Sequence, residues 1–157
     1  MIDLEELLGG LAPLSSGNFV RQLKNRLKKE GLEIAEKSGA KYFAACSGGP
    51  TVMLLSHEST DHGLWGIRAD IVERCLEKLH EPTLWGAVLL DGSATRGFWI
   101  PGHHIKLTAD SFSAVNQQHL FHKNRLMVIE SLCPYFIGIH DFLEKTGLGS
   151  RITKIEI

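Results

Sequence analysis

Apolar residues near the start of the chain recur every three to four positions, the spacing of one face of an α-helix. This stripe consists of Phe19, Leu23, Leu27 and Ile34. It predicts a helix over 19–37, which Gly39 would end. A shorter helix is expected over 3–8, before two consecutive glycines.

Beyond Gly39 the pattern changes to short apolar runs separated by turn-forming residues, which is typical of strands. Three runs are expected to be strands: 41–46, 51–57 and 63–68. Helical spacing returns over 70–80, and Pro82 follows it. The next run, Leu84–Leu90, is almost entirely apolar, the pattern of a strand covered on both faces. Residues 97–100 are expected to form the strand after it.

The signals are weaker in the last third of the chain. We expect a short strand over 118–122, a short helix over 141–145 and a final strand over 151–157, while 125–132 fits a helix or a strand. No linker divides the sequence, so residues 1–157 are predicted to form a single domain. The predicted class is α/β (or α+β), with a mixed β-sheet of about five to six strands flanked by helices.

The composition is that of an ordinary globular domain. Of 157 residues, 43% are hydrophobic and 22% are charged, and the net charge of −1 gives no global argument for binding nucleic acid or a membrane surface. The longest apolar runs are too short to span a bilayer. The first residues are acidic where a signal peptide would be basic, so we expect a soluble, cytoplasmic protein with no membrane partner.

The expected order of elements in the first two thirds of the chain is helix, three strands, helix, buried strand, strand. This order resembles the restriction-endonuclease-like fold of the PD-(D/E)xK nuclease superfamily, whose core is αβββαβ. In the stretch 84–102 a buried strand turns through Asp-Gly-Ser into Arg-Gly-Phe-Trp-Ile-Pro-Gly. That stretch is similar to the late strands of small nuclease-like domains that carry an aromatic YWI segment. The resemblance covers about residues 18–102.

The resemblance implies a specific active site, with an Asp on the second core strand and an acid-x-Lys on the third. In such a site two carboxylates hold Mg²⁺, and the Lys stabilises the attacking water and the charge that develops on the phosphoryl group. Neither part is found in the runs 51–57 and 63–68, and no acidic residue in the chain is followed two positions later by Lys. The site is therefore expected to be degenerate. The nearest substitutes are Glu58, Asp61, Arg68 and Asp70, the candidate catalytic residues.

Histidines are numerous, with eight in the chain, and two of them lie in a segment that also contains carboxylates. The candidate metal ligands are His57, Glu58, Asp61 and His62. Imidazole and carboxylate are ligands of Zn²⁺ and Mn²⁺, but this spacing matches no known metal motif, and exposed turn residues would give the same pattern. No cofactor is expected unless the chain is an enzyme, in which case a divalent metal is expected.

The predicted helix over 19–37 carries six basic and three acidic residues, whereas 57–91 carries three basic and seven acidic residues. The candidate nucleic-acid-binding residues are Arg21, Lys24, Lys28 and Lys29. They could contact phosphates, although a solvated helix face with interleaved Lys and Glu has the same pattern.

Three functions follow from these observations. The first is a binding or interaction module with a degenerate nuclease-like core, whose partner is a protein, a second copy or a nucleic acid. The second is a metal-dependent phosphodiesterase or nuclease with a relocated acidic and histidine site. The third is a homo-oligomerising structural protein in which the apolar end Ile152–Ile157 pairs with a second copy.

Overall fold

The computed structural model describes residues 3–11, 17–36, 41–46, 52–58, 63–80 and 84–148. Its helices are α1 (Leu4–Leu8), α2 (Asn18–Lys29), α3 (Ala69–Lys78), α4 (Ile105–Thr108), α5 (Lys123–Val128) and α6 (Ile139–Thr146), with a 3₁₀ turn η1 (Gly102–His104). Its strands are β1 (Glu33–Glu36), β2 (Tyr42–Cys46), β3 (Val52–Glu58), β4 (Leu64–Arg68), β5 (Leu84–Leu90), β6 (Arg96–Pro101), β7 (Ser111–Ser113), β8 (Gln118–His122) and β9 (Tyr135–Ile137). No helix in these ranges is long and apolar enough to cross a membrane.

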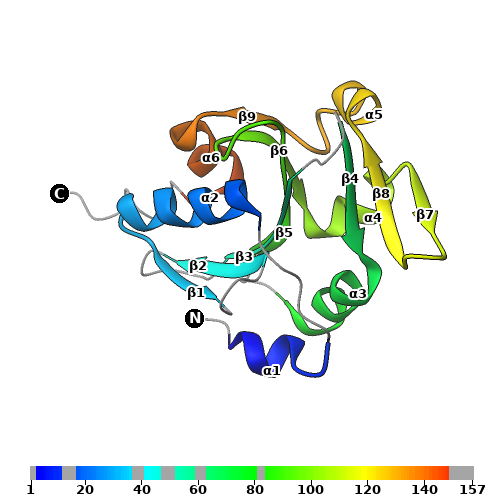
Figure 1. The fold of residues 1–157 in the computed structure, drawn as a ribbon, viewed down its shortest axis with the longest axis horizontal. Coiled ribbons are helices and arrows are strands. Elements are labelled where there is room, and N and C mark those ends of the chain that lie inside the picture. The colour runs from blue at the N-terminus through cyan, green and yellow to red at the C-terminus, as the bar shows by residue number, and fades with distance from the viewer. Residues whose placement is uncertain are drawn as a thin grey trace.

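A six-stranded mixed sheet forms the centre of the molecule (Figure 1). Its strands lie in the order β1-β2-β3-β5-β6-β9, and every neighbouring pair is antiparallel except β3 and β5. Parallel neighbours need a crossover connection, and α3 lies on the chain between these two strands. The predicted fold class, α/β or α+β with a mixed sheet flanked by helices, is confirmed.

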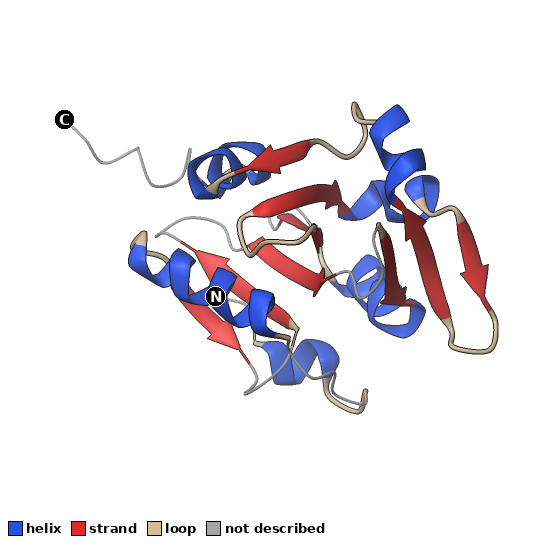
Figure 2. Ribbon diagram, turned by 45° about the horizontal axis from the view of Figure 1, so that its top comes forward, coloured by secondary structure: helices blue, strands red, loops and turns tan. Residues whose placement is uncertain are grey.

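The assignment of one predicted core strand is wrong. Strand β4 was expected in the main sheet, but it pairs with β8, and β7 completes a second sheet in the order β4-β8-β7. This small sheet lies on the side of the molecule away from α2 (Figures 1 and 2). The three strands of the main sheet before α3 are therefore β1, β2 and β3. The prediction had β2, β3 and β4 in these places.

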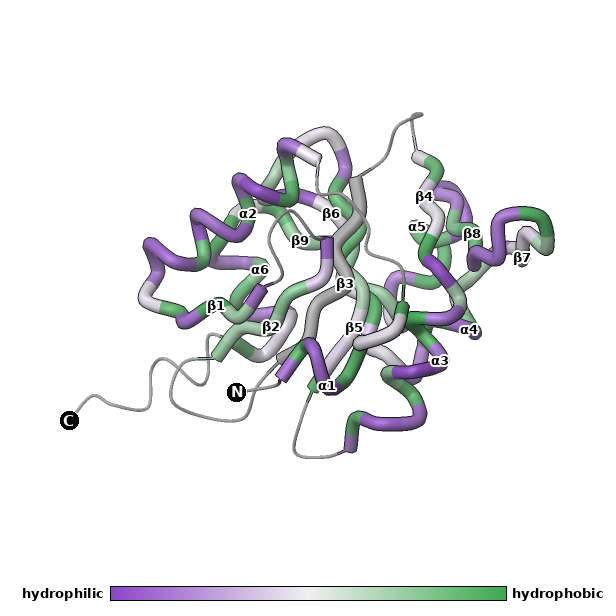
Figure 3. The backbone as a smooth tube through the Cα atoms, turned by 60° about the horizontal axis from the view of Figure 1, so that its bottom comes forward, coloured by the Kyte–Doolittle hydropathy of each residue, from purple (hydrophilic) through white to green (hydrophobic). Residues whose placement is uncertain are grey.

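The extra core strand, β1, lies in the second half of the predicted helix 19–37. The prediction of a helix is therefore wrong for that half. Helix α2 ends at Lys29, because Gly31 has a φ of +93°, a left-handed conformation that ends a helix and favours glycine. Ile34 fits the helical stripe by spacing but lies in β1, where it packs on the same core as α2. Helix α2 itself is amphipathic, as its alternating purple and green segments show (Figure 3).

Strand β5 is covered on both faces. Ala87 and Leu89 belong to a core cluster with α1 and α3, whereas Val88 and Leu90 belong to a second cluster with α2 and α6. All four side chains are 0% exposed. The prediction of a buried central strand is confirmed, as are the short elements expected over 118–122 and 141–145. The first half of the ambiguous segment 125–132 falls in helix α5 and the second half is turn, and the strand predicted over 151–157 lies outside the described residues.

Replacing Val88 with Asp is expected to lower the free energy of unfolding by about 4 kcal/mol or more, because the new carboxylate has no partner inside the core. The matched control is Val115→Asp, since Val115 is 93% exposed, and this change should stay within about 0.5 kcal/mol of the parent. Urea denaturation followed by circular dichroism measures both. Equal stability of the two variants would contradict the central position of β5.

Candidate functional site

Only some of the predicted metal and catalytic residues lie in the described part of the chain. His57 and Glu58 end strand β3, in register with Leu89 and Leu90 of β5. Asp61 and His62 lie outside the described residues. Because β3 and β5 are parallel, both strands end at the same edge of the sheet. Glu58 therefore lies at this edge, which we call the carboxyl edge.

Arg68 and Asp70 do not join that edge. They pair with each other, with Nε of Arg68 2.9 Å from Oδ1 of Asp70, which also accepts the backbone N–H of Ile71 at 2.8 Å. Burial opposes ionisation of Asp70, but the hydrogen bonds and charge of Arg68 outweigh it and lower the pKa of this carboxyl. The pair lies at the start of α3, so its contacts stabilise that helix end. In the described part of the chain, no group of three His, Cys, Asp or Glu side chains is arranged to hold a metal ion.

The structure instead brings together three polar residues that are far apart in sequence. Asp91 directly follows β5, and its Oδ2 accepts hydrogen bonds from Nζ of Lys123 at 2.8 Å and from the hydroxyl of Tyr135 at 2.9 Å. The side chain of Asp91 is 15% exposed and that of Lys123 is 42% exposed. A pocket of about 230 Å³ is lined by Gly63, Asp91, His122, Lys123 and Asn124. We call this the Asp91 pocket.

The surroundings of Asp91 keep its carboxyl group ionised and keep the Tyr135 hydroxyl protonated. Burial opposes ionisation of Asp91, but the hydrogen bonds from Lys123 and Tyr135, with the charges of Lys123 and Arg96, lower its pKa. Burial and the hydrogen bond to Asp91 raise the pKa of Tyr135 to about 12. At neutral pH the pocket therefore contains a carboxylate held between a cation and a hydroxyl donor.

Gly63 brings the start of β4 against α5 at this pocket. Its φ is +79°, and a Cβ atom at this position would lie 2.8 Å from Cβ of Lys123. Its carbonyl oxygen accepts the backbone N–H of Lys123 at 2.8 Å. Only glycine satisfies both the backbone conformation and the close approach. Beside Lys123, Nδ1 of His122 lies 3.1 Å from Oδ2 of Asp110.

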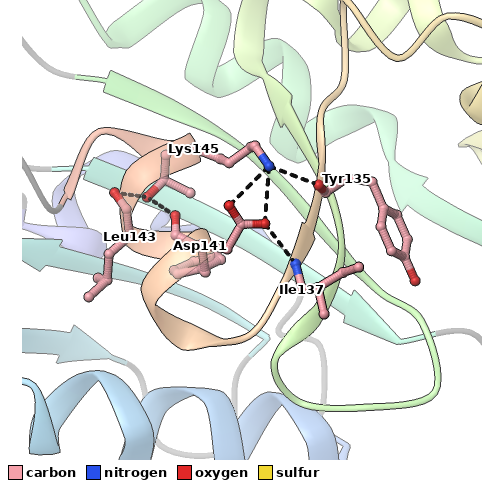
Figure 4. A network of polar contacts seen from close by, with 7 residues as sticks. Tyr135, Ile137, Asp141, Leu143 and Lys145 are labelled. Carbon is pink, nitrogen blue, oxygen red and sulfur yellow. Dashed lines mark hydrogen bonds and ion pairs between the residues drawn. The ribbon is translucent and has the colours of Figure 1, made fainter.

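A second polar network positions Tyr135 (Figure 4). Nζ of Lys145 donates to the carbonyl oxygen of Tyr135 at 3.2 Å and lies 3.0 Å from both carboxylate oxygens of Asp141. Asp141 also accepts the backbone N–H of Ile137 at 2.9 Å. Helix α6 is thereby joined to β9, and the backbone that carries the Tyr135 side chain is held in place.

The predicted nucleic-acid-binding residues on α2 divide into two groups. Lys24 is 3% exposed, with Nζ 3.0 Å from Oε2 of Glu36 and 5.5 Å from the centre of the Phe43 ring. Lys28 binds the same carboxylate at 3.2 Å, and Arg21 donates to Asn18. The side chains of Lys24 and Lys28 thus join α2 to β1, and Lys24 is not part of an open basic face.

The remaining candidate, Lys29, lines a polar pocket of about 360 Å³ together with Arg26. This pocket, which we call the α2 pocket, is lined by Gln22, Asn25, Arg26, Lys29, Ser93, Ala94 and Thr95. No carboxylate is among these lining residues, and neither cation makes an ion pair within the described parts of the chain. Cations next to hydroxyl and amide groups match the chemistry of a phosphate-like anion.

The hydrogen bond from Tyr135 to Asp91 gives a test by pH. Because the folded-state pKa of Asp91 lies below the ordinary 3.8, the pair stabilises the fold above that pH, and the contribution is lost as pH falls through the lowered value. Tyr135→Phe is expected to raise the pKa of Asp91, as measured by NMR titration of the carboxyl carbon. Tyr42→Phe, a hydroxyl removal on β2, is the control and should leave that pKa unchanged. An unchanged pKa in both variants would mean that the hydroxyl does not bind Asp91.

Comparison with known proteins gives no family for this chain: no family model matches it, and no curated protein matches it either. Its function is therefore argued from its own residues.

Proposed function

We propose that the chain is a nucleic-acid-binding module built on a nuclease-like core that lacks the acid-x-Lys site. The α2 pocket is the observation that carries this proposal. No carboxylate lines the pocket beside its two cations, and Ser93 and Thr95 line it from the β5–β6 turn. Phosphate groups are bound by such sets of Arg, Lys and hydroxyl side chains in nucleic-acid complexes.

The sheet order supports the nuclease-like core. Helix α2 precedes β1, β2 and β3, and α3 leads into β5 and β6, the order that the resemblance implies. With β2 and β3 as the second and third core strands, the motif positions fall on Tyr42–Cys46 and Val52–Glu58. Strand β2 contains no acidic residue, and β3 contains Glu58 but no Lys. The expected active-site motif is therefore missing from these strands as well.

Both polar pockets border the β5–β6 turn. Ser93, Ala94 and Thr95 line the α2 pocket, whereas Asp91 at the start of the turn lines the other pocket with Lys123. A phosphate backbone that crosses this turn would meet Arg26 and Lys29 on one side and Lys123 on the other. Such contacts depend on charge and position, so we expect binding with little sequence preference. We include a cytoplasmic location in this proposal, because the three cysteines are free and buried, as is usual where thiols stay reduced.

A metal-dependent phosphodiesterase is the second candidate, favoured by the Asp91–Lys123 pair. An acid and a lysine lie 2.8 Å apart at the carboxyl edge, where open α/β sheets commonly bind ligands. Glu58 is in register with Leu90, the residue before Asp91. A carboxylate and a lysine could thus come from separate elements instead of one strand. A protein partner or a second copy is the remaining alternative.

The first test is binding to fluorescein-labelled single- and double-stranded oligonucleotides, measured by anisotropy at several salt concentrations. The double variant Arg26→Gln/Lys29→Gln is expected to bind about tenfold more weakly or worse. Its log K should also depend less on log[salt], with the slope reduced by about 1.8 on duplex DNA and about 1.4 on single strands, because two phosphate contacts are lost.

The control for this test is Lys78→Gln/Lys106→Gln, which removes the same charge from exposed lysines of α3 and α4. It should leave affinity and slope close to the parent values. No binding of the parent at low salt would refute the nucleic-acid proposal, and a protein partner or a second copy would then be the leading alternative. An equal effect of both double variants would refute the assignment of the α2 pocket.

The second test is cleavage of DNA and RNA in Mg²⁺ or Mn²⁺. The proposed binding module should cleave neither, because the chain has no acid-x-Lys. Reproducible cleavage that is lost in Asp91→Asn, Lys123→Met or Glu58→Ala, and kept in Glu77→Gln at an exposed position of α3, would instead establish the phosphodiesterase. Cleavage that is lost only in Asp61→Ala would place a catalytic carboxylate after β3.

A further inference from the structure

A third pocket lies at the other end of β5, where the strand begins. It has a volume of about 360 Å³ and is lined by Leu76, Leu79, His80, Leu84, Trp85, Trp99, Pro101, Gly102, His103 and Thr146. None of these residues carries an Asp, Glu, Lys or Arg side chain. We propose that this aromatic pocket binds a flat, uncharged heteroaromatic group of the size of a nucleobase.

The two indole rings in the pocket come from opposite faces of the main sheet. Trp85 packs against the core cluster that contains α3, whereas Trp99 belongs to the cluster that contains α2 and α6. They meet in one pocket because it lies at the end of the sheet, where its two faces join. Indole rings bind flat aromatic groups through offset-stacked or edge-to-face contacts.

Glycines on the neighbouring backbone hold both rings in place. A Cβ atom on Gly102 would lie 2.2 Å from Cε2 of Trp85, and a Cβ atom on Gly86 would lie 2.7 Å from Cη2 of Trp99. Each indole therefore packs directly against backbone that has no side chain. Walls that are already in position reduce the entropy that a ligand must lose on binding.

The exposed leucines of the pocket indicate a surface that a ligand could cover. Leu76 is 37% exposed and Leu84 is 39% exposed, and burial of such apolar area on binding is favourable. A volume of about 360 Å³ is at the small end of the range of about 300 to 1,000 Å³ that is typical of small-molecule sites. The size therefore fits one small ring system and not a folded segment of a partner.

The polar groups of the pocket decide between a hydrocarbon ring and a heteroaromatic ring. His80 and His103 line the pocket, and neither imidazole ring has a hydrogen-bond partner among the described residues. An imidazole offers one donor and one acceptor when neutral. These match the ring nitrogens and exocyclic groups of a nucleobase, and the lack of charged lining residues favours an uncharged ligand.

Adenosine titration followed by ¹H–¹⁵N NMR tests this site directly. Two of the three indole N–H signals, those of Trp85 and Trp99, should shift in a saturable way. The signal of Trp65 should not, because its Nε1 donates to the carbonyl oxygen of Leu90 at 2.9 Å, at the far end of β5. Cyclohexanol, which is apolar but not flat, should bind at least about tenfold more weakly, since it cannot stack.

Substitutions identify the pocket independently of the spectra. Leu76→Arg and Leu84→Arg, which introduce a long charged side chain at partly exposed positions, should each weaken adenosine binding by about tenfold or more. Leu107→Arg is the control, since Leu107 is 62% exposed on α4 and does not line the pocket. Thermal unfolding shows which variants fold, and either folded pocket variant suffices for the comparison.

Three results would overturn the inference: no saturable shift with adenosine, a shift of the Trp65 signal alone, or equal binding of adenosine and cyclohexanol. Unchanged affinity in a folded pocket variant would also overturn it. The inference does not rest on the proposed function, because the α2 pocket and the aromatic pocket lie at opposite ends of β5. Loss of one kind of binding therefore leaves the other test intact.

Discussion

The parallel pairing of β3 with β5 is the constraint on which the rest of the structure depends. Seven residues of β3 are in register with seven of β5, from Val52 with Leu84 to Glu58 with Leu90. Parallel neighbours cannot be joined by a tight turn, so the intervening chain must leave the sheet and return. Strand β4 and helix α3 form on that excursion, and β4 then becomes the first strand of the second sheet. The same pairing places the ends of both strands at the carboxyl edge.

Local patterns in the sequence predict the central strand but not every partner of it. The run Leu84–Leu90 is apolar at almost every position because both of its faces are covered. The strand β1 has no comparable signal, since its four residues, Glu-Ile-Ala-Glu, do not alternate between polar and apolar, and Ile34 continues a helical stripe in spacing. A short turn over residues 30–32, with Gly31 in the left-handed conformation, separates it from α2. Strand β4 looks like a strand of the main sheet because Trp65 and Ile67 are buried, but β4 belongs to the second sheet, and these side chains pack in the core cluster that also contains Leu89 of β5.

The polar sites were less predictable because they form from residues that are distant in sequence. Asp91, Lys123 and Tyr135 come from the end of β5, the start of α5 and the start of β9. No spacing rule joins three such positions. The basic residues of α2 are different, because the sequence correctly predicts a basic helix. It does not show that Glu36 of β1 binds Lys24 and Lys28. That contact leaves Arg26 and Lys29 as the cations of the α2 pocket.

Strand β5 also explains why the molecule has polar and apolar pockets at opposite ends. At its carboxyl end the chain turns through Asp91, whose ionised side chain requires donors, and Lys123 and Tyr135 supply them. At its other end the strand begins with Leu84 and Trp85, beyond the region where both faces of the sheet are fully covered. Apolar side chains there remain partly exposed, because the helices on the two faces do not close over the end of the sheet. A single buried strand thus separates a charged surface at its carboxyl end from an uncharged aromatic surface at its other end, and the closely packed core between them keeps the two apart.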